Sequence, residues 1–137
     1  MKPEYEEALC EEFPLLYANR QHSWRETPMG FGIECGEGWF PLLRDLSTKL
    51  EALILHLPMN ERKEYRADQV KEKFGTLRFH MTALTDEMRE AIQTAEAASA
   101  ETCELCGASG VLRSEGWFKT LCDRHHEERE AKKPARH

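Results

Sequence analysis

The segment from Cys103 to His125, CELCGASGVLRSEGWFKTLCDRH, decides the fold of the C-terminal third of the chain. It contains two ligand pairs, Cys103-x2-Cys106 and Cys122-x2-His125, separated by fifteen residues. Cysteine and histidine pairs at this spacing match the needs of a tetrahedral zinc ion. Because four protein ligands leave no position for water or substrate, the segment predicts a structural Zn²⁺ rather than a catalytic one.

The residues around these ligands predict how the finger folds. Gly107 lets the backbone turn sharply after the first pair. Residues 111–113 and 117–121 have the composition of two short strands, and the residues after Cys122 have that of a helix. A knuckle, a hairpin and a ligand pair at the start of a helix resemble the treble-clef zinc finger.

The remaining cysteines and histidines leave alternatives open. His125 repeats the two-residue spacing of the first pair and is favoured as the fourth ligand, but His126 stays an alternative. Cys10 and Cys35 fall outside the finger and are expected to be small buried hydrophobic residues. Metal-ligand spacing together with leftover thiols favours a reducing cytosol over a secreted, disulfide-bonded protein.

The composition of the 137 residues, 40% hydrophobic and 32% charged, predicts one compact unit with a small appendage. We expect an α+β body over residues 1–100. The zinc-finger module, docked on the body and ending in a frayed tail, is expected over 101–137. The acidic start lacks the apolar core of a signal peptide, and no apolar run could span a bilayer, so a cytoplasmic protein is expected.

Residue periodicity predicts the elements of the body. Apolar residues at three- and four-residue steps indicate helices, and alternating apolar and polar residues indicate a half-buried strand. Thr85 followed by two acids is typical of a helix start. The expected elements are a helix over 4–18 that Pro14 could break or kink, a loop over 19–38, a helix over 39–57, a small antiparallel hairpin over 65–82 with Gly75 in its turn, and a helix from Thr85.

A glycine-rich stretch, residues 30–39, invites comparison with a phosphate-binding loop. The comparison fails because no strand precedes the glycines, no Lys-Ser/Thr pair follows them, and Glu34 and Glu37 would repel phosphate. The stretch is instead expected to form a tight loop that brings Trp39 into the core. If the loop has a function, Trp24, Glu34 and Glu37 would contact a protein partner.

The net charge of −6 disfavours attraction to nucleic acid, because phosphate binding requires a clustered positive surface. Residues 61–80 are the exception, with six bases and four acids. Within them Lys71, Lys73 and Arg78 are interleaved with aromatic residues, as in strands that bind nucleic acid. A nucleic-acid-binding regulator is therefore an alternative function.

Two features weaken that alternative at the level of sequence. Glu72 and Asp68 interrupt the basic pattern, which is also that of an ordinary amphipathic hairpin. Arg113, Trp117 and Lys119 would extend the pattern only if the finger docks beside the hairpin.

No set of residues supports catalysis. Cys35 with His22 or His80 could form a nucleophile–base pair, but nothing in the sequence fixes their distance or supplies an orienting group. A nuclease-like finger would need further histidine and acidic residues, and residues 108–121 contain only Glu115. An enzyme is the least favoured hypothesis.

Three segments stand out together: GEGWFPLL at 36–43, VKEKFGTLRF at 70–79, and the finger from Cys103 to His125 with its CELCG and TLCDRH ends. As a set they resemble a group of small, mostly uncharacterised proteins encoded by bacteriophages, prophages and neighbouring mobile DNA. The resemblance covers most of residues 13–126 and implies a bacterial cytoplasmic setting. It implies no activity and no catalytic residue.

We therefore expect a non-enzymatic, zinc-containing binding protein of phage or mobile-element type. It would occlude or bridge a host macromolecular complex, either a protein or a protein–nucleic-acid assembly. Small acidic phage proteins include inhibitors of host defence complexes, among them anti-CRISPR proteins, so by analogy a defence complex is a candidate target.

Overall fold

The computed structural model describes residues 1–134 and has an α+β fold. The described α-helices are α1 (Pro3–Glu12), α2 (Phe40–Leu55), α3 (Asp86–Ser99) and α4 (Asp123–Ala131). Short 3₁₀ helices are η1 (Ala18–Gln21), η2 (Pro28–Phe31), η3 (Glu37–Trp39) and η4 (Arg62–Glu64). The strands are β1 (Ile33–Glu34), β2 (Ala67–Lys73), β3 (Thr76–Met81), β4 (Val111–Arg113) and β5 (Lys119–Leu121).

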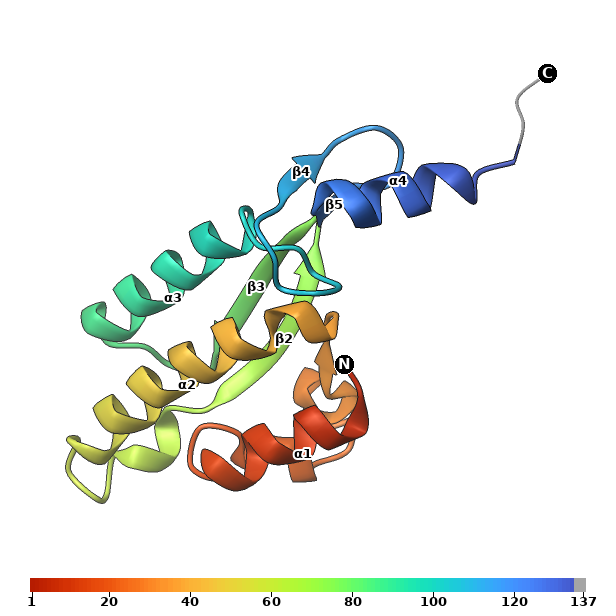
Figure 1. Cartoon of the computed structure of the whole chain (residues 1–137). Helices are drawn as coiled ribbons and strands as arrows, with labels where there is room; N and C mark the ends of the chain where they lie inside the picture. The colour runs from red at the N-terminus through yellow and green to blue at the C-terminus, as the bar shows by residue number, and fades with distance from the viewer. Residues whose placement is uncertain (135–137) are drawn as a thin grey trace.

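The centre of the body is a three-stranded sheet of order β1-β2-β3. β1 is parallel to β2, with Ile33 opposite Val70, and β2 is antiparallel to β3, with Val70 opposite Phe79. α2 and α3 lie side by side across one face of this sheet (Figure 1). The β4–β5 hairpin and α4 lie beyond the end at which β2 turns into β3 (Figure 1).

A two-residue turn, Phe74-Gly75, joins β2 to β3. Both residues have positive φ, 54° and 85°, as a type I′ turn requires to match the twist of the strands. The Glu72 carboxylate accepts a hydrogen bond from Gly75 N at 2.7 Å. A Cβ on Gly75 would lie 2.5 Å from Leu112 Cδ1, so glycine also lets the turn approach the finger.

Side chains satisfy backbone groups at both edges of the sheet. On the β3 edge, Leu77 N donates to Ser99 Oγ and Phe79 N donates to Glu96 Oε2, both at 2.9 Å. On the β1 edge, Ile33 N donates to the Glu6 carboxylate. Because unpaired edge groups can recruit another strand, these contacts help to keep the sheet at three strands.

The core lies between the sheet and the two long helices. α2 buries Leu43, Leu46, Leu50 and Ile54, whose three- and four-residue steps place them on one helix face. Trp39 is fully buried at the start of α2, which confirms the expected role of the glycine-rich loop.

Two expectations for the N-terminal part are wrong. The helix expected over 4–18 does not continue past Pro14 and ends at Glu12, because Phe13 precedes Pro14 and the residue before a proline is disfavoured in helical conformation. The stretch expected as a loop, 19–38, contains the 3₁₀ helix η2 and the strand β1, so the sheet is mixed rather than a hairpin alone.

The other elements form where the sequence predicts them. The 39–57 helix, the 65–82 hairpin and α3 are confirmed, and Thr85 caps α3 by accepting a hydrogen bond from Met88 N at 3.2 Å. The finger hairpin and its helix are also present. Of the frayed tail expected over 131–137, Ala131 belongs to α4 and residues 135–137 lie outside the described part. The division between body and finger at residue 100 stays a prediction.

Candidate metal centre

The first ligand pair lies in a tight turn between α3 and β4. Cys103 N donates to Ala108 O at 2.8 Å, and Gly107 N donates to Cys103 O at 2.9 Å. Gly107 has a φ of 81°, which side chains disfavour, so glycine closes this turn.

The second pair starts α4. Cys122 is the N-cap residue, and its Sγ accepts a hydrogen bond from His125 N at 3.5 Å. Because residues three apart share one side of a helix, this cap brings the side chains of Cys122 and His125 together.

The four predicted ligands converge, since their donor atoms all lie within 4.8 Å of one another. The Sγ atoms of Cys106 and Cys122 are 3.8 Å apart, and His125 Nδ1 lies 3.6 Å from Cys103 Sγ and 3.2 Å from Cys122 Sγ. Tetrahedral bonds of about 2.3 Å to sulfur and about 2.0 Å to nitrogen place sulfur atoms about 3.8 Å apart and sulfur about 3.5 Å from nitrogen. The donor set therefore fits a tetrahedral metal ion.

The structure distinguishes the two candidate histidines. His125 Nδ1 faces the thiols, while its Nε2 lies 3.9 Å from Glu128 Oε2. His126 lies outside the cluster, and its Nδ1 is buried without a hydrogen-bond partner among residues 1–134. The geometry places His125 in the fourth ligand position.

Backbone amides favour the thiolate of the first cysteine. Burial raises the pKa of Cys103, but hydrogen bonds from the backbone of Cys122, Cys106 and Leu105 outweigh burial and lower it from 9.0 to about 6. A backbone hydrogen bond from Ala108 lowers the pKa of Cys106, but burial and the neighbouring thiols outweigh it and raise that pKa. A cation among the sulfur atoms would relieve the repulsion between adjacent thiolates.

The turn that carries the first ligand pair, residues 103–107, which we call the knuckle, lies against glycines of the body. Gly38 N donates to Glu104 O at 2.7 Å, and Gly36 N donates to Glu104 Oε2 at 2.9 Å. A Cβ on Gly38 would lie 2.2 Å from Cys103 O, so only glycine permits this approach. The GEGWFPLL segment thus supplies the surface that receives the knuckle.

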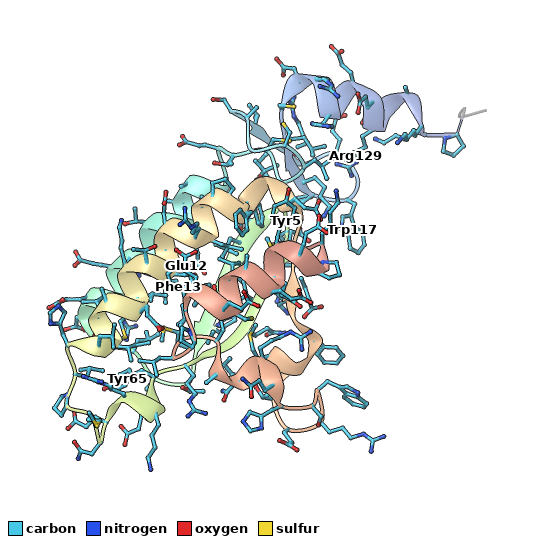
Figure 2. The ribbon with its side chains drawn as sticks, turned by 60° about the horizontal axis from the view of Figure 1, so that its bottom comes forward. Tyr5, Glu12, Phe13, Tyr65, Trp117 and Arg129 are labelled. Carbon is cyan, nitrogen blue, oxygen red and sulfur yellow. The ribbon has the colours of Figure 1, made fainter. Side chains whose placement is uncertain are left out.

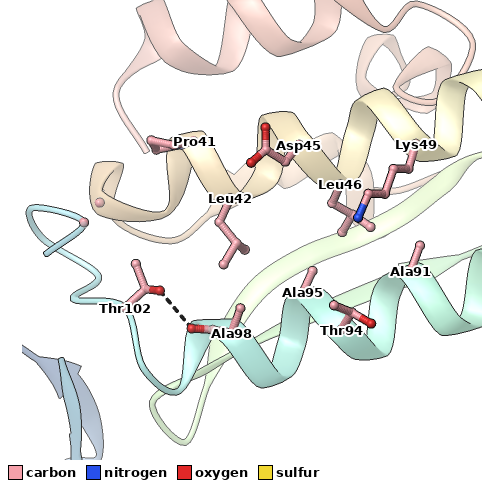
Figure 3. A pocket seen from close by; sticks show the side chains of 12 residues that line it. Pro41, Leu42, Asp45, Leu46, Lys49, Ala91, Thr94, Ala95, Ala98 and Thr102 are labelled. Carbon is pink, nitrogen blue, oxygen red and sulfur yellow. Dashed lines mark hydrogen bonds between the residues drawn. The ribbon is translucent and has the colours of Figure 1, made fainter. Parts of the chain in front are cut away.

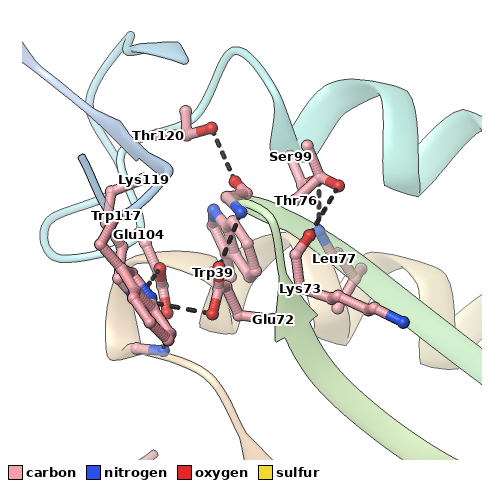
Figure 4. A network of polar contacts seen from close by, with 12 residues as sticks. Trp39, Glu72, Lys73, Thr76, Leu77, Ser99, Glu104, Trp117, Lys119 and Thr120 are labelled. Atoms are coloured by element: carbon pink, nitrogen blue, oxygen red, sulfur yellow. Dashed lines mark hydrogen bonds and ion pairs between the residues drawn. The ribbon is translucent and has the colours of Figure 1, made fainter. Parts of the chain in front are cut away.

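A polar network joins the finger hairpin to the β2–β3 turn (Figure 4). Lys119 Nζ lies 3.2 Å from Glu104 Oε1 and 3.5 Å from Glu72 Oε2. Thr120 Oγ1 donates to Gly75 O at 2.7 Å. Because both carboxylates are largely buried, Lys119 supplies the charge that compensates them.

No family model, curated protein or solved structure matches this chain. Among the helices of residues 1–134, none combines the length and the apolar composition that crossing a membrane requires.

The residues predicted to contact a protein partner differ in their availability. Trp24 is 57% exposed and stacks on Phe31, with ring centroids 5.8 Å apart. Glu34 is exposed on β1. Glu37, in contrast, accepts a hydrogen bond from Lys2 N at 2.9 Å, so its carboxylate already has a structural partner.

The predicted basic residues of the hairpin share one face of the sheet. Lys71 lies opposite Arg78, and Lys73 lies opposite Thr76. Since side chains alternate along a strand, these residues point away from the face that buries Leu77. The finger does not extend the group, because Arg113 pairs with Asp123 at 2.9 Å and Lys119 lies between two carboxylates.

Phe74, Trp117 and Phe118 gather into one exposed group, which we call the aromatic surface. The sequence placed Phe74 in the basic-aromatic pattern and offered Trp117 as its extension, but it did not predict that the two meet together with Phe118. Phe74 is 63% and Trp117 is 76% exposed, and the rings of Phe74 and Phe118 meet edge to face at 6.4 Å. The three residues line a pocket of about 460 Å³. Trp117 projects from the finger beside Arg129, whose guanidinium donates to Trp117 O (Figure 2). A phenylalanine where a type I′ turn favours asparagine was the available signal.

The pocket between α2 and α3 and the two remaining cysteines contribute no ligand to the metal centre. A pocket of about 350 Å³ between α2 and α3 is lined by small and aliphatic residues such as Leu42 and Ala95, without cysteine or histidine (Figure 3). Cys35 is buried, as expected, whereas Cys10 is half-buried. Burial raises the pKa of Cys35 to about 12 and that of Cys10 to about 11, the opposite of what a nucleophilic thiolate needs.

Proposed function

We propose that this chain is a non-enzymatic binding protein, stabilised by a structural Zn²⁺, that docks on a protein component of a host complex through the aromatic surface. The observation that carries the proposal is the backbone of Phe74. A bulky residue with a φ of 54° is rare, and the left-handed region costs about 1–2 kcal/mol for residues other than glycine. Strain of this kind concentrates at functional sites.

The exposure of Phe74 supports a role in binding rather than in packing. Its side chain is 63% exposed, so little buried area offsets the strain. Trp117 and Phe118 stand beside it, and Lys73 Nζ lies 5.5 Å above the Phe74 ring. Aromatic residues next to a pocket are the usual anchors of protein interfaces.

The donor set supports zinc in a structural role. Three cysteines and one histidine are a typical structural zinc set, and four protein ligands leave no open coordination position. The order of knuckle, hairpin and helix further supports a treble-clef-like finger. An enzymatic role has no such support.

The resemblance to phage and mobile-element proteins supports a bacterial cytoplasmic setting, where a host defence complex is a candidate target and inhibition, as by anti-CRISPR proteins, a candidate outcome. The nucleic-acid-binding alternative loses its finger component, because Arg113 and Lys119 are already paired with carboxylates.

The test is a pull-down from bacterial lysate, run with and without nuclease, with tagged, zinc-loaded protein and with Trp117→Ala. Met59→Ala is the matched control, since Met59 is 80% exposed and lies at the opposite end of α2 from the finger. A protein that wild type and Met59→Ala retain, and that Trp117→Ala loses, would support the proposal. Equal retention by Trp117→Ala, or a catch that nuclease abolishes, would contradict it.

A further inference from the structure

A surface pocket of about 310 Å³ lies between β3 and α3, away from the metal centre. Its polar lining comes from Arg78 and His80 on β3 and from Arg89, Gln93 and Glu96 on α3. The lining thus contains two arginines and a histidine but a single carboxylate. We propose that this pocket binds a phosphoryl group.

Arg78 carries the buried polar atom of this pocket that has no hydrogen-bond partner among the described residues. Its Nε is buried and has no hydrogen-bond partner among the described residues. A buried donor without a partner is costly, and a bound anion or ordered water would satisfy it. The planar guanidinium presents paired N–H groups that match two oxygens of a phosphoryl group.

The only carboxylate in the pocket lining is already occupied. Glu96 Oε2 accepts the hydrogen bond from Phe79 N at 2.9 Å. None of the ion pairs found in residues 1–134 includes Arg78, His80 or Arg89. Two arginines therefore line the pocket without an ion-pair partner among the described residues, and Glu96 is the one carboxylate that lines it with them.

The neighbouring strand reinforces this charge. Lys71 lies opposite Arg78 on the same face of the sheet. Of the two acids that interrupt the basic pattern in sequence, Glu72 points to the other face and binds Lys119, and Asp68 accepts a hydrogen bond from Thr27 Oγ1 at 3.1 Å. On β1, Glu34 lies opposite Lys71, so an acidic residue marks the β1 edge of the sheet face that carries Lys71 and Arg78.

The phosphoryl group could belong to free phosphate or to the backbone of a nucleic acid, and two probes distinguish these sources. The zinc-loaded full chain is titrated with inorganic phosphate and, separately, with a mixed-sequence single-stranded DNA oligonucleotide. The readout is the Arg78 Nε–Hε resonance, because this group makes the proposed contact. The proposal is independent of the aromatic surface, so it can fail while the proposed function stands.

A saturable shift of the Arg78 resonance with phosphate would support a free-anion site. A shift with the oligonucleotide alone would support a nucleic-acid backbone site. Binding that leaves this resonance unmoved, or no binding of either probe, would overturn the proposal.

Variants test the same site without NMR. Arg78→Gln and Arg89→Gln should each weaken binding of the effective probe about tenfold or more, the usual effect of losing a charge-assisted hydrogen bond. Lys49→Gln, which removes one positive charge from exposed α2, should leave affinity within about twofold. Arg89 is exposed, so its variant keeps the test valid if Arg78→Gln misfolds. Equal affinity of Arg89→Gln and Lys49→Gln would contradict the proposal.

Discussion

Trp39 Nε1 donates a hydrogen bond to Thr102 O at 2.9 Å. The indole is fully buried in the core of the body, and Thr102 directly precedes the first metal ligand. Gly38, the residue before Trp39, also bonds to the knuckle through Glu104 O. A core residue of the body is thereby coupled to the position of the metal centre.

Metal removal should therefore disturb the environment of Trp39. In a variant with Trp24→Phe and Trp117→Phe, Trp39 is the remaining tryptophan of the three. Chelation should shift its emission to longer wavelength and lower the free energy of unfolding by at least about 3 kcal/mol, since structural zinc sites contribute folding energy directly. Cys106→Ser should reproduce the effect, and Cys10→Ser should not. Unchanged emission after complete metal loss would show that the body does not sense the knuckle.

Gly38 and Gly116 offer a matched pair of glycine substitutions. Gly38→Ala drives a Cβ against the backbone of Cys103, so it should cost about 2–3 kcal/mol and weaken metal affinity. Gly116→Ala meets no atom within 4 Å and should cost only about 1 kcal/mol for its positive φ. Denaturant unfolding and competition with a chromophoric chelator measure the two effects. If Gly116→Ala loses as much metal affinity as Gly38→Ala, close approach of the knuckle is not the cause.

The metal ligands and most elements of the body could be predicted because each depends on local spacing. The Cys103-x2-Cys106 knuckle, the alternation of β3 and the repeat of α2 are all visible in short windows of sequence. β1 could not be predicted in this way, because a two-residue strand has no periodicity and exists through its pairing with β2.

Local sequence patterns also could not predict which side chains gather on each surface of the protein. Glu72 reads as an interruption of a basic patch, yet the alternation of β2 turns it toward Lys119 and away from Lys71. Phe74 reads as a strand aromatic, yet it occupies the turn with positive φ. The contacts of both residues depend on the finger, because Glu72 pairs with Lys119 and the ring of Phe74 meets that of Phe118, each more than 40 residues later in the chain.

Lys119→Met should destabilise the protein, because it leaves the carboxylates of Glu72 and Glu104 without a counter-charge. These side chains are 14% and 6% exposed, and breaking such a pairing costs about 2–3 kcal/mol. Adding Glu72→Gln should recover part of the loss, a coupling that a double-mutant cycle in urea measures. Lys133→Met, at a more exposed ion pair, should change stability by less than about 1 kcal/mol. If the effects of Lys119→Met and Glu72→Gln on the free energy of unfolding are simply additive, the two residues are not coupled.

Stability should fall at alkaline pH, in part because of Cys35. Burial raises its pKa from 9.0 to about 12, so above pH 9 the unfolded thiol loses a proton that the folded thiol keeps. The folded state then binds more protons, and its stability decreases with rising pH by at most about 1.4 kcal/mol per unit from this group. Cys35→Ser should show a shallower decline between pH 9 and 10.5 in urea unfolding. An identical slope would mean that Cys35 titrates normally in the folded protein.

Phe74→Asn should stabilise the fold and weaken partner binding. Asparagine tolerates the left-handed backbone and forms, with Gly75, the dipeptide preferred in type I′ turns, so the free energy of unfolding should rise by about 1 kcal/mol. The same change removes an exposed ring from the aromatic surface, so less of the partner captured by wild type should be retained. Phe74→Leu keeps the strain and an apolar side chain, and therefore separates backbone from side-chain effects. If Phe74→Asn lowers stability, the ring of Phe74 contributes packing that outweighs its backbone strain, and the turn is structural rather than a binding feature.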